Sequence, residues 1–367
     1  MKGTVRSRID YVFEAIEFLY RYVNNDSYPD LMKKLMYKYT LNDKMEEKLS
    51  CIVDISEYIY SNMNLNKEKL DFYFHSINDE FICFAKLILL THTTVSKHTL
   101  EEKLELLRSY NQFEIYNHML GLLAENGSFS EEWDRNSKEI TDYLSIIEKA
   151  SIEIADKWNL LKVFLNYNSY LTELEEMLRG VIALIKDKED VMNEIVSEFT
   201  SYWTDFIENN DLYNYIESSL NLNISNIAKE VIIIPSIAGC NGISCTMSVN
   251  ELGKINDTCL YMHKGVLFGD SISIKLQKLD KNQVTSLLKL LSDKSKMDIL
   301  IYIKDKKAYG QELASHFNLT TATISHHMST LHAAGLVNLE RDTNRIYYSL
   351  NKEKLNRFLD NVKQLLI

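Results

Sequence analysis

Apolar residues recur every three or four positions through most of the first 230 residues, the spacing of one face of an α-helix. The clearest stripe consists of Ile9, Val12, Phe13, Ile16, Leu19 and Tyr20. The same spacing predicts further helices over residues 31–39, 43–63, 66–92, 99–124, 131–150, 151–166, 168–186, 187–209 and 211–220. The pattern therefore predicts a large helical body over residues 1–230.

The composition of the sequence changes after residue 230, where β-branched residues become frequent. Short strands are predicted over residues 231–236, 243–249 and 258–262, because β-branched side chains favour an extended, half-buried backbone. The tripeptide His263-Lys264-Gly265 suggests a turn after the last of them. We interpret residues 231–279 as a small β-rich segment that connects the helical body to residues 280–367.

A helix, a tight turn and a second helix are predicted between Tyr309 and Val337. The apolar faces of the two helices consist of Leu313, Ala314 and Phe317 and of Ile324, Met328 and Leu331. Asn318 and Leu319 form the corner, and a threonine at 320 or 321 is placed to cap the second helix. Gly335 supplies a left-handed stop. This is a helix-turn-helix pattern, whose second helix fits the major groove of DNA.

The outer face of the second helix carries side chains that form hydrogen bonds and are small enough to approach base edges. They are Thr321, Thr323, Ser325, His326 and Ser329. Residues 337–350 then alternate as two strands around a polar turn, which predicts a β-hairpin, the wing of a winged helix. Arg341 and Arg345 flank its tip, where they can meet phosphate or the minor groove. The alternative is an ordinary helical hairpin with a solvated polar face.

Three linked segments resemble the ArsR-type winged-helix repressors. Residues 287–300 resemble the opening of that domain, Ile324-Ser325-His326-His327-Met328 its recognition helix, and Ala334-Gly335-Leu336-Val337 the segment after it. Lys294 and Lys296 stand where the family commonly has proline and arginine. The resemblance covers about residues 281–367 and implies a homodimer, with a terminal helix over 351–366 in the dimer interface. The alternative is that this helix packs back on its own domain or on the helical body. The expected fold class is mainly α (α+β): a large helical N-terminal body, a small β segment and a C-terminal winged helix-turn-helix.

The net charge of −11 argues against nucleic-acid binding only when the chain is taken as a whole. Residues 281–367 hold 13 Lys and Arg against 8 Asp and Glu, whereas the rest of the chain holds 28 against 44. Because phosphate contacts depend on the nearby field, a basic C-terminal domain on an acidic body is compatible with DNA binding.

The sequence contains no feature of a secreted or membrane protein. Acidic residues interrupt the apolar residues near the N-terminus, and the longest apolar stretch, residues 81–90, is too short to span a bilayer. Five widely spaced cysteines fit reduced thiols rather than a disulfide framework. We therefore expect a cytoplasmic protein.

No metal site of the family's kind is expected. The resemblance implies cysteine ligands early in the helix before the recognition helix, but Tyr309 and Gln311 stand there, and residues 352–367 contain no histidine. Cys240, Cys245 and Cys259 lie beside His263 in the β segment, either as a thiol or metal cluster or as small buried hydrophobes. Their spacing favours the second interpretation. Neither a cofactor motif nor a catalytic constellation stands out, so no cofactor and no enzymatic activity are expected.

The combined pattern predicts a transcription regulator, a repressor in preference to an activator, that binds double-stranded operator DNA as a homodimer. We expect the N-terminal body to sense an effector or to stabilise the dimer. Because this body is rich in aromatic residues, an aromatic-lined cleft for an apolar or amphipathic small molecule is the expected form of an effector site. The alternative is an enzyme or ligand-binding protein that uses its winged helix for protein contact.

Overall fold

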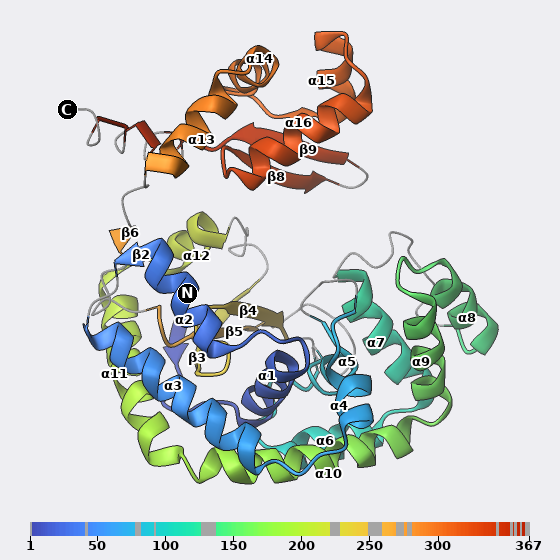
Figure 1. Cartoon of the computed structure of the whole chain (residues 1–367). Coiled ribbons are helices and arrows are strands. Elements are labelled where there is room, and N and C mark those ends of the chain that lie inside the picture. Colours follow the sequence, from blue (N-terminus) through green and yellow to red (C-terminus); the bar gives the residue numbers. More distant parts are fainter. Residues whose placement is uncertain are drawn as a thin grey trace. The chain divides into compact units, whose positions relative to one another are not determined.

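The chain forms two compact units in a computed structural model, Met1–Lys275 (unit 1) and Leu276–Ile367 (unit 2). The structure describes residues 2–40, 43–77, 82–91, 93–125, 137–220, 228–248, 259–268, 275–276, 281–342, 345–352, 355, 358–359 and 362–363. Among these residues, no helix is both long and apolar enough to cross a membrane. The mainly helical fold class predicted from the sequence is confirmed (Figure 1).

Unit 1 consists of helices packed around one small sheet (Figure 1). The helices are α1 Tyr11–Val23, α2 Tyr28–Lys38, α3 Asp43–Asn62, α4 Lys67–Phe74, α5 Phe84–Leu89, α6 Leu100–Ser109, α7 Gln112–Glu125, α8 Ile140–Lys149, α9 Ile154–Leu165, α10 Tyr167–Lys186, α11 Glu189–Asn209 and α12 Leu212–Leu220. α1 begins where the apolar stripe predicts, because Asp10 caps it by accepting hydrogen bonds from the N–H groups of Val12 and Phe13.

Two predicted helices are each divided in two. The helix expected over residues 66–92 ends as α4 at Phe74, since His75 adopts an extended backbone, and α5 begins only at Phe84. The helix expected over residues 99–124 is interrupted where Tyr110 is extended. Asn111 then accepts hydrogen bonds from the N–H groups of Phe113 and Glu114 and starts α7. Periodicity alone missed both breaks, because the apolar spacing continues across them.

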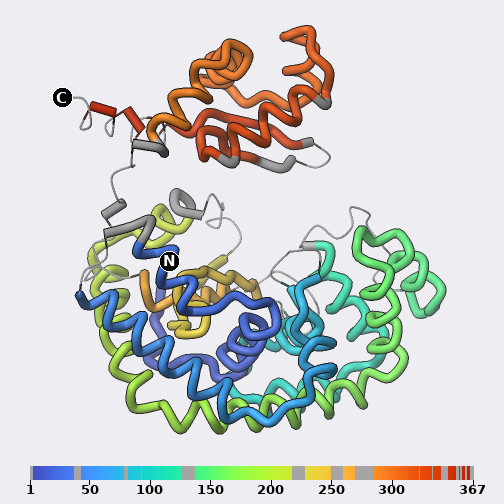
Figure 2. Tube along the Cα trace, in the orientation of Figure 1, coloured from blue at the N-terminus to red at the C-terminus, as the bar shows by residue number. Residues whose placement is uncertain are grey.

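The sheet of unit 1 joins the first residues of the chain to the β segment. Its strands lie in the order β1 (Lys2–Val5), β3 (Glu230–Ser236), β5 (Cys259–Gly265) and β4 (Ile243–Met247). β1, β3 and β5 are parallel, and β4 runs antiparallel to β5. The N-terminal strand pairs with β3 from Lys2 with Glu230 to Val5 with Ile233. Figure 2 traces the course of the chain from the N-terminus (blue) through these elements. The strands expected in a separate connecting segment over 231–279 are therefore part of the larger unit.

Helices cover both faces of this sheet. On one face, Phe13 of α1 stacks on His263 of β5 with ring centroids 3.8 Å apart. On the other face, Lys264 lies against Trp203 of α11. His263 and Lys264 are thus consecutive buried residues of a strand, so the predicted turn at His263-Lys264-Gly265 was wrong. A strand residue pointing to each face is what the two-residue period of an extended chain requires.

Unit 2 has its own apolar core and the elements of a winged helix. These are α13 Lys281–Leu291, α14 Lys294–Tyr302, β7 Ala308–Tyr309, α15 Gly310–Phe317, α16 Thr321–Ala333, β8 Val337–Asp342 and β9 Arg345–Leu350, drawn in orange to red in Figure 1. The sheet has the order β7-β9-β8 and is antiparallel. The strands β2 (Tyr39–Thr40) and β6 (Lys275–Leu276) have two residues each.

The terminal helix predicted over residues 351–366 lies mostly outside the described residues. Among its described residues, Leu355 packs against the core of unit 2 and Phe358 is buried, whereas Leu359 is exposed. Its use as a dimer interface stays a prediction.

Candidate nucleic-acid interface

The corner between α15 and α16 depends on one left-handed residue. Asn318 ends α15 with φ 53°, and the N–H of Leu319 then donates to the carbonyl of Ala314. Asparagine tolerates this conformation better than most residues, because its short polar side chain can bond locally. At the far end of α16, Gly335 has φ 73° and starts the turn into β8. Both the corner and the glycine stop are placed as the sequence predicts.

Thr320 is the residue that caps α16. Its hydroxyl accepts a hydrogen bond of 3.1 Å from the N–H of Thr323, and the two hydroxyl oxygens are 2.8 Å apart. A capping hydroxyl satisfies one of the N–H groups that lack a partner within the helix. The hydroxyl of Thr323 therefore already contacts the capping residue. It is less available to a base edge than a free hydroxyl is.

The two faces of α16 separate as the apolar spacing predicts. Ile324, Met328 and Leu331 are buried in the core of unit 2. The exposed side chains on the opposite face are Thr321, Ser325, His326 and Ser329, with Thr323 half-buried. Thr321, Ser325 and Ser329 follow one another at four-residue spacing and therefore form one row along the helix. The arrangement presents hydroxyl and imidazole groups from a helix anchored by its apolar side.

His327 is the half-buried neighbour of His326 on α16. Its Nδ1 is buried without a hydrogen-bond partner among the described residues. Burial lowers the pKa of His327, and the nearby charge of Lys296 lowers it further. The ring is thus neutral and half-buried, while its neighbour His326 faces outward.

The wing is the hairpin of β8 and β9. Its last backbone pairs are Arg341 with Ile346 and Asp342 with Arg345, so both arginines lie next to the tip. The tip itself, Thr343 and Asn344, lies outside the described residues. The short strand β7 adds a third strand by pairing with β9, and no sequence signal distinguished its two residues from a loop.

Contacts between α14 and α15 hold the helix-turn-helix in position, and sequence reasoning missed them. The hydroxyl of Tyr302 donates to Glu312 at 3.0 Å, and the ring of Tyr302 packs on His316 with centroids 4.2 Å apart. Lys306 also lies over that ring, with its Nζ 3.5 Å from the centroid. Such pairs join residues on different helices, so spacing along the chain gives no sign of them.

No group of three or more His, Cys, Asp or Glu side chains that can hold a metal ion occurs in the described part of the chain. Tyr309 and Gln311, at the family's metal position, lie at the start of α15. Cys240 is buried, and burial raises the pKa of its thiol to about 12. Cys245 and Cys259 are half-buried, with pKa values raised to about 11 by the same cause. These thiols are thus protonated at neutral pH.

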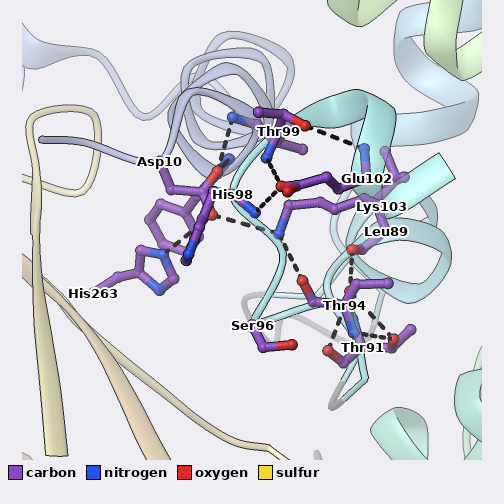
Figure 3. Close-up of polar contacts among 12 residues, drawn as sticks. Asp10, Leu89, Thr91, Thr94, Ser96, His98, Thr99, Glu102, Lys103 and His263 are labelled. Carbon is purple, nitrogen blue, oxygen red and sulfur yellow. Dashed lines mark hydrogen bonds and ion pairs between the residues drawn. The ribbon is translucent and has the colours of Figure 1, made fainter. Parts of the chain in front are cut away.

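Unit 1 buries a small cluster of titratable side chains at the N-terminus of α1 (Figure 3). Nζ of Lys103 lies 3.4 Å from Oδ2 of Asp10 and donates to the carbonyl of Thr94 at 2.9 Å. Nε2 of His263 lies 3.8 Å from the same carboxylate oxygen, beyond hydrogen-bond distance. Burial alone raises the pKa of Asp10. The charge of Lys103, the contact with His263 and the N–H groups at the start of α1 outweigh burial and hold this pKa well below its usual range. Burial lowers the pKa of His263.

Two other buried groups lie at the carboxyl ends of the parallel strands. Oε2 of Glu14 accepts hydrogen bonds from the N–H groups of Ile237 and Ala238, and burial raises the pKa of Glu14 to about 8. Lys264 donates to the hydroxyl of Tyr215 at 3.2 Å and lies among aromatic rings, with Nζ 4.5 Å from the ring centroid of Trp203. Burial lowers the pKa of Lys264 to about 8. Glu14 and Lys264 are both buried among other side chains.

The aromatic residues of unit 1 pack against one another, as the stacked rings of Tyr116 and Phe164 do. Two grooves of about 460 and 470 Å³ lie on its surface, and each exposes polar and apolar surface in similar amounts. They are lined by Glu101, Leu104, Glu105, Arg108, Ser109 and Arg179 and by Ser7, Arg8, Asn193, Ser197, Thr200 and Ser201. The expectation of an aromatic-lined cleft therefore has no counterpart in these grooves.

Comparison with known proteins matches the C-terminal part of the chain. The family model "Bacterial regulatory protein, arsR family" matches residues 293–338. The arsenical resistance operon repressor of Staphylococcus aureus is 32% identical over 80 residues, which are 22% of this chain and 77% of the repressor. The transcriptional activator HlyU of Vibrio cholerae is 26% identical over 94 residues, 25% of this chain and 87% of HlyU. The solved structure of reduced HlyU from Vibrio cholerae covers 25% of this chain and 100% of its own, with 25% identity and a TM-score of 0.20.

Proposed function

The chain belongs to the ArsR family of bacterial regulatory proteins through its C-terminal unit, and from this premise we propose that it is a homodimeric repressor. It binds operator DNA with α16 in the major groove and the wing against the backbone. The observation that carries this proposal is the outer face of α16, where Thr321, Ser325, His326 and Ser329 are exposed. Hydroxyl and imidazole groups on an exposed recognition helix are suited to hydrogen bonds with base edges.

We assign the base contacts to these four residues and to Thr323, and the backbone contacts to Arg341 and Arg345. The local excess of basic residues in 281–367 supports the second assignment, because phosphate contacts depend on nearby positive charge. The engagement of Thr323 with the cap at Thr320 makes it the weakest of the five base contacts. Repression follows when a bound dimer occupies promoter DNA that the polymerase needs.

We further propose that unit 1 senses an effector or stabilises the dimer, and that it catalyses no reaction. Its two surface grooves expose polar and apolar surface in similar amounts, which fits an amphipathic effector. Small shifts of the body change affinity, because two recognition helices read half-sites only when they lie about 34–36 Å apart. Comparing residues 276–367 with the full chain in dimerisation and operator affinity tests this role. Equal behaviour of the two would contradict it.

The regulator works without the family's metal sites. Tyr309 and Gln311 offer no thiolate, so zinc, cadmium or arsenite should leave the DNA complex intact. Release of DNA by one of these metals, abolished by Cys240→Ser with Cys245→Ser, would contradict this.

Selection of bound DNA from a random pool by the full-length protein tests the function directly. The expected product is a two-fold symmetric motif whose half-sites lie about 10 base pairs apart or a multiple of that. The motif should then be found near the gene's own promoter. Absence of any enriched motif would favour the alternative, an enzyme or ligand-binding protein that uses its winged helix for protein contact.

A further inference from the structure

The outer face of α9 carries the most exposed large hydrophobic side chains of the described residues. Ile154 is 75% exposed, Leu165 67% and Trp158 63%, whereas the next most exposed, Ile301, reaches 55%. Leu161 adds a half-buried side chain between them. α9 lies with α7 and α8 at one end of unit 1 (Figure 1). Exposed apolar side chains that are contiguous in this way mark contact surfaces more often than isolated ones do.

These side chains form a single narrow stripe. Ile154, Trp158, Leu161 and Leu165 follow one another at spacings of four, three and four residues, the repeat that two packed helices share along their contact. The opposite face of α9 is already used, since Asp156, Leu160, Val163 and Phe164 are buried in unit 1. The helix is therefore apolar on two sides, and only one of them has a partner in the described residues.

The charges beside the stripe discriminate between occupants. Lys157 and Lys162 lie on its two sides, at the positions that exchange ion pairs across a pair of helices. Nζ of Lys162 donates only to Asn159 among the described residues, and Nζ of Lys157 to the carbonyl of Glu148. In a parallel pair with a second copy, Lys157 would face Lys162, and in an antiparallel pair neither lysine would meet a carboxylate. A second copy thus leaves these charges opposed or unpaired.

We propose that the outer face of α9 is a docking surface for an amphipathic helix of another protein, whose apolar stripe is flanked by glutamate or aspartate. Apolar side chains of the partner, such as leucine, cover Ile154, Trp158 and Leu165. Its carboxylates pair with Lys157 and Lys162. The contact has the form of an amphipathic helix laid on an apolar surface, with side chains spaced at three and four residues as anchors. It lies on unit 1 and is independent of DNA binding by α16.

A pair of synthetic helical peptides tests this surface on the full-length protein. Both carry leucines at the same three- and four-residue spacing, and one has glutamates and the other lysines beside them. Fluorescence anisotropy should show that the glutamate peptide binds about tenfold more tightly, the difference expected from two exposed ion pairs. Trp158→Asp should abolish binding. Lys157→Glu with Lys162→Glu should reverse the preference, whereas Lys33→Glu with Lys34→Glu on α2 should leave it unchanged.

Three results would overturn the proposal. Equal affinity for the two peptides would contradict selection of the partner by charge. No binding of either peptide would contradict docking of a helix. A fall in self-association of the full-length protein with Trp158→Asp, measured by analytical ultracentrifugation without peptide binding, assigns the stripe to a second copy. Acrylamide quenching that is the same in wild type and Trp158→Phe shows that another part of this chain already covers the stripe.

Discussion

Glu14 is a carboxyl group that folding keeps protonated. Its pKa is raised to about 8 by burial, although the N–H groups of Ile237 and Ala238 favour the charged form. Between the ordinary pKa near 4.5 and about 8, the folded chain holds a proton that the unfolded chain has lost. The free energy of unfolding therefore falls as the pH rises through this window. The amide of glutamine has the shape of the protonated acid and carries no such cost.

Glu14→Gln should accordingly stabilise unit 1 increasingly from pH 5 to pH 8.5, by on the order of 2–4 kcal/mol at the upper end. Urea unfolding at several pH values measures the difference. Glu57→Gln, on the exposed side of α3, is the matched control for the loss of one negative charge. A gain that is the same at pH 5 and pH 8.5 would contradict the assignment of a protonated Glu14.

Lys103 is the buried partner of Asp10, and removing it leaves a carboxylate without its nearest counter-charge. Lys103→Met should lower the free energy of unfolding by about 3–5 kcal/mol, the cost of an uncompensated buried charge. Because the pKa of Asp10 is lowered in the folded chain, the stability from this carboxylate is present above its unfolded pKa and lost as the pH falls. Lys103→Met should weaken that acid dependence. Lys149→Met on α8, at an exposed position, should change stability by less than about 0.5 kcal/mol. Equal effects of the two substitutions would be inconsistent with the ion pair.

At the scale of elements, α16 and its surroundings show what the sequence predicts well. The buried stripe of Ile324, Met328 and Leu331, the corner at Asn318 and the stop at Gly335 are local features with local causes. The breaks after Phe74 and near Tyr110 were missed, because the apolar period runs on through them. β1 was missed for a different reason: its partner β3 is more than two hundred residues away, and no local pattern announces such a pairing.

The cap of α16 is the element most directly testable by substitution. Thr320→Ala removes the hydroxyl that accepts from the N–H of Thr323, and it should lower the stability of unit 2 by about 1 kcal/mol. Thr330→Ala is the matched control, since its hydroxyl only donates to the carbonyl of His326 within the same helix. Thermal unfolding of residues 276–367 compares the two. A larger loss from Thr330→Ala would show that the helix is not held by its cap.

The whole molecule combines a C-terminal unit that resembles the ArsR-family regulators with a larger helical unit. The sequence predicted the winged helix because its motifs lie close together and resemble known ones. The sheet and the helices on its two faces bring Asp10, Lys103 and His263 together on one face and bury Lys264 on the other. The same packing buries Glu14 against the backbone after β3. Each looks ordinary in the sequence, so neither their burial nor their pKa shifts could be predicted. The exposed stripe of α9 could not be predicted from the sequence either. The apolar spacing indicates two apolar faces of this helix but does not indicate which of them is buried.

We propose that the outer face of α16 reads DNA. The affinity of Ser325→Ala with His326→Ala for the selected operator, measured at one salt concentration beside the wild type, tests this reading. Each lost base contact should cost about 1–3 kcal/mol, so specific affinity should fall tenfold or more while binding to unrelated DNA stays the same. Ser295→Ala, which removes an exposed hydroxyl from α14, should leave both affinities unchanged. Unchanged operator affinity in the double variant would contradict the account.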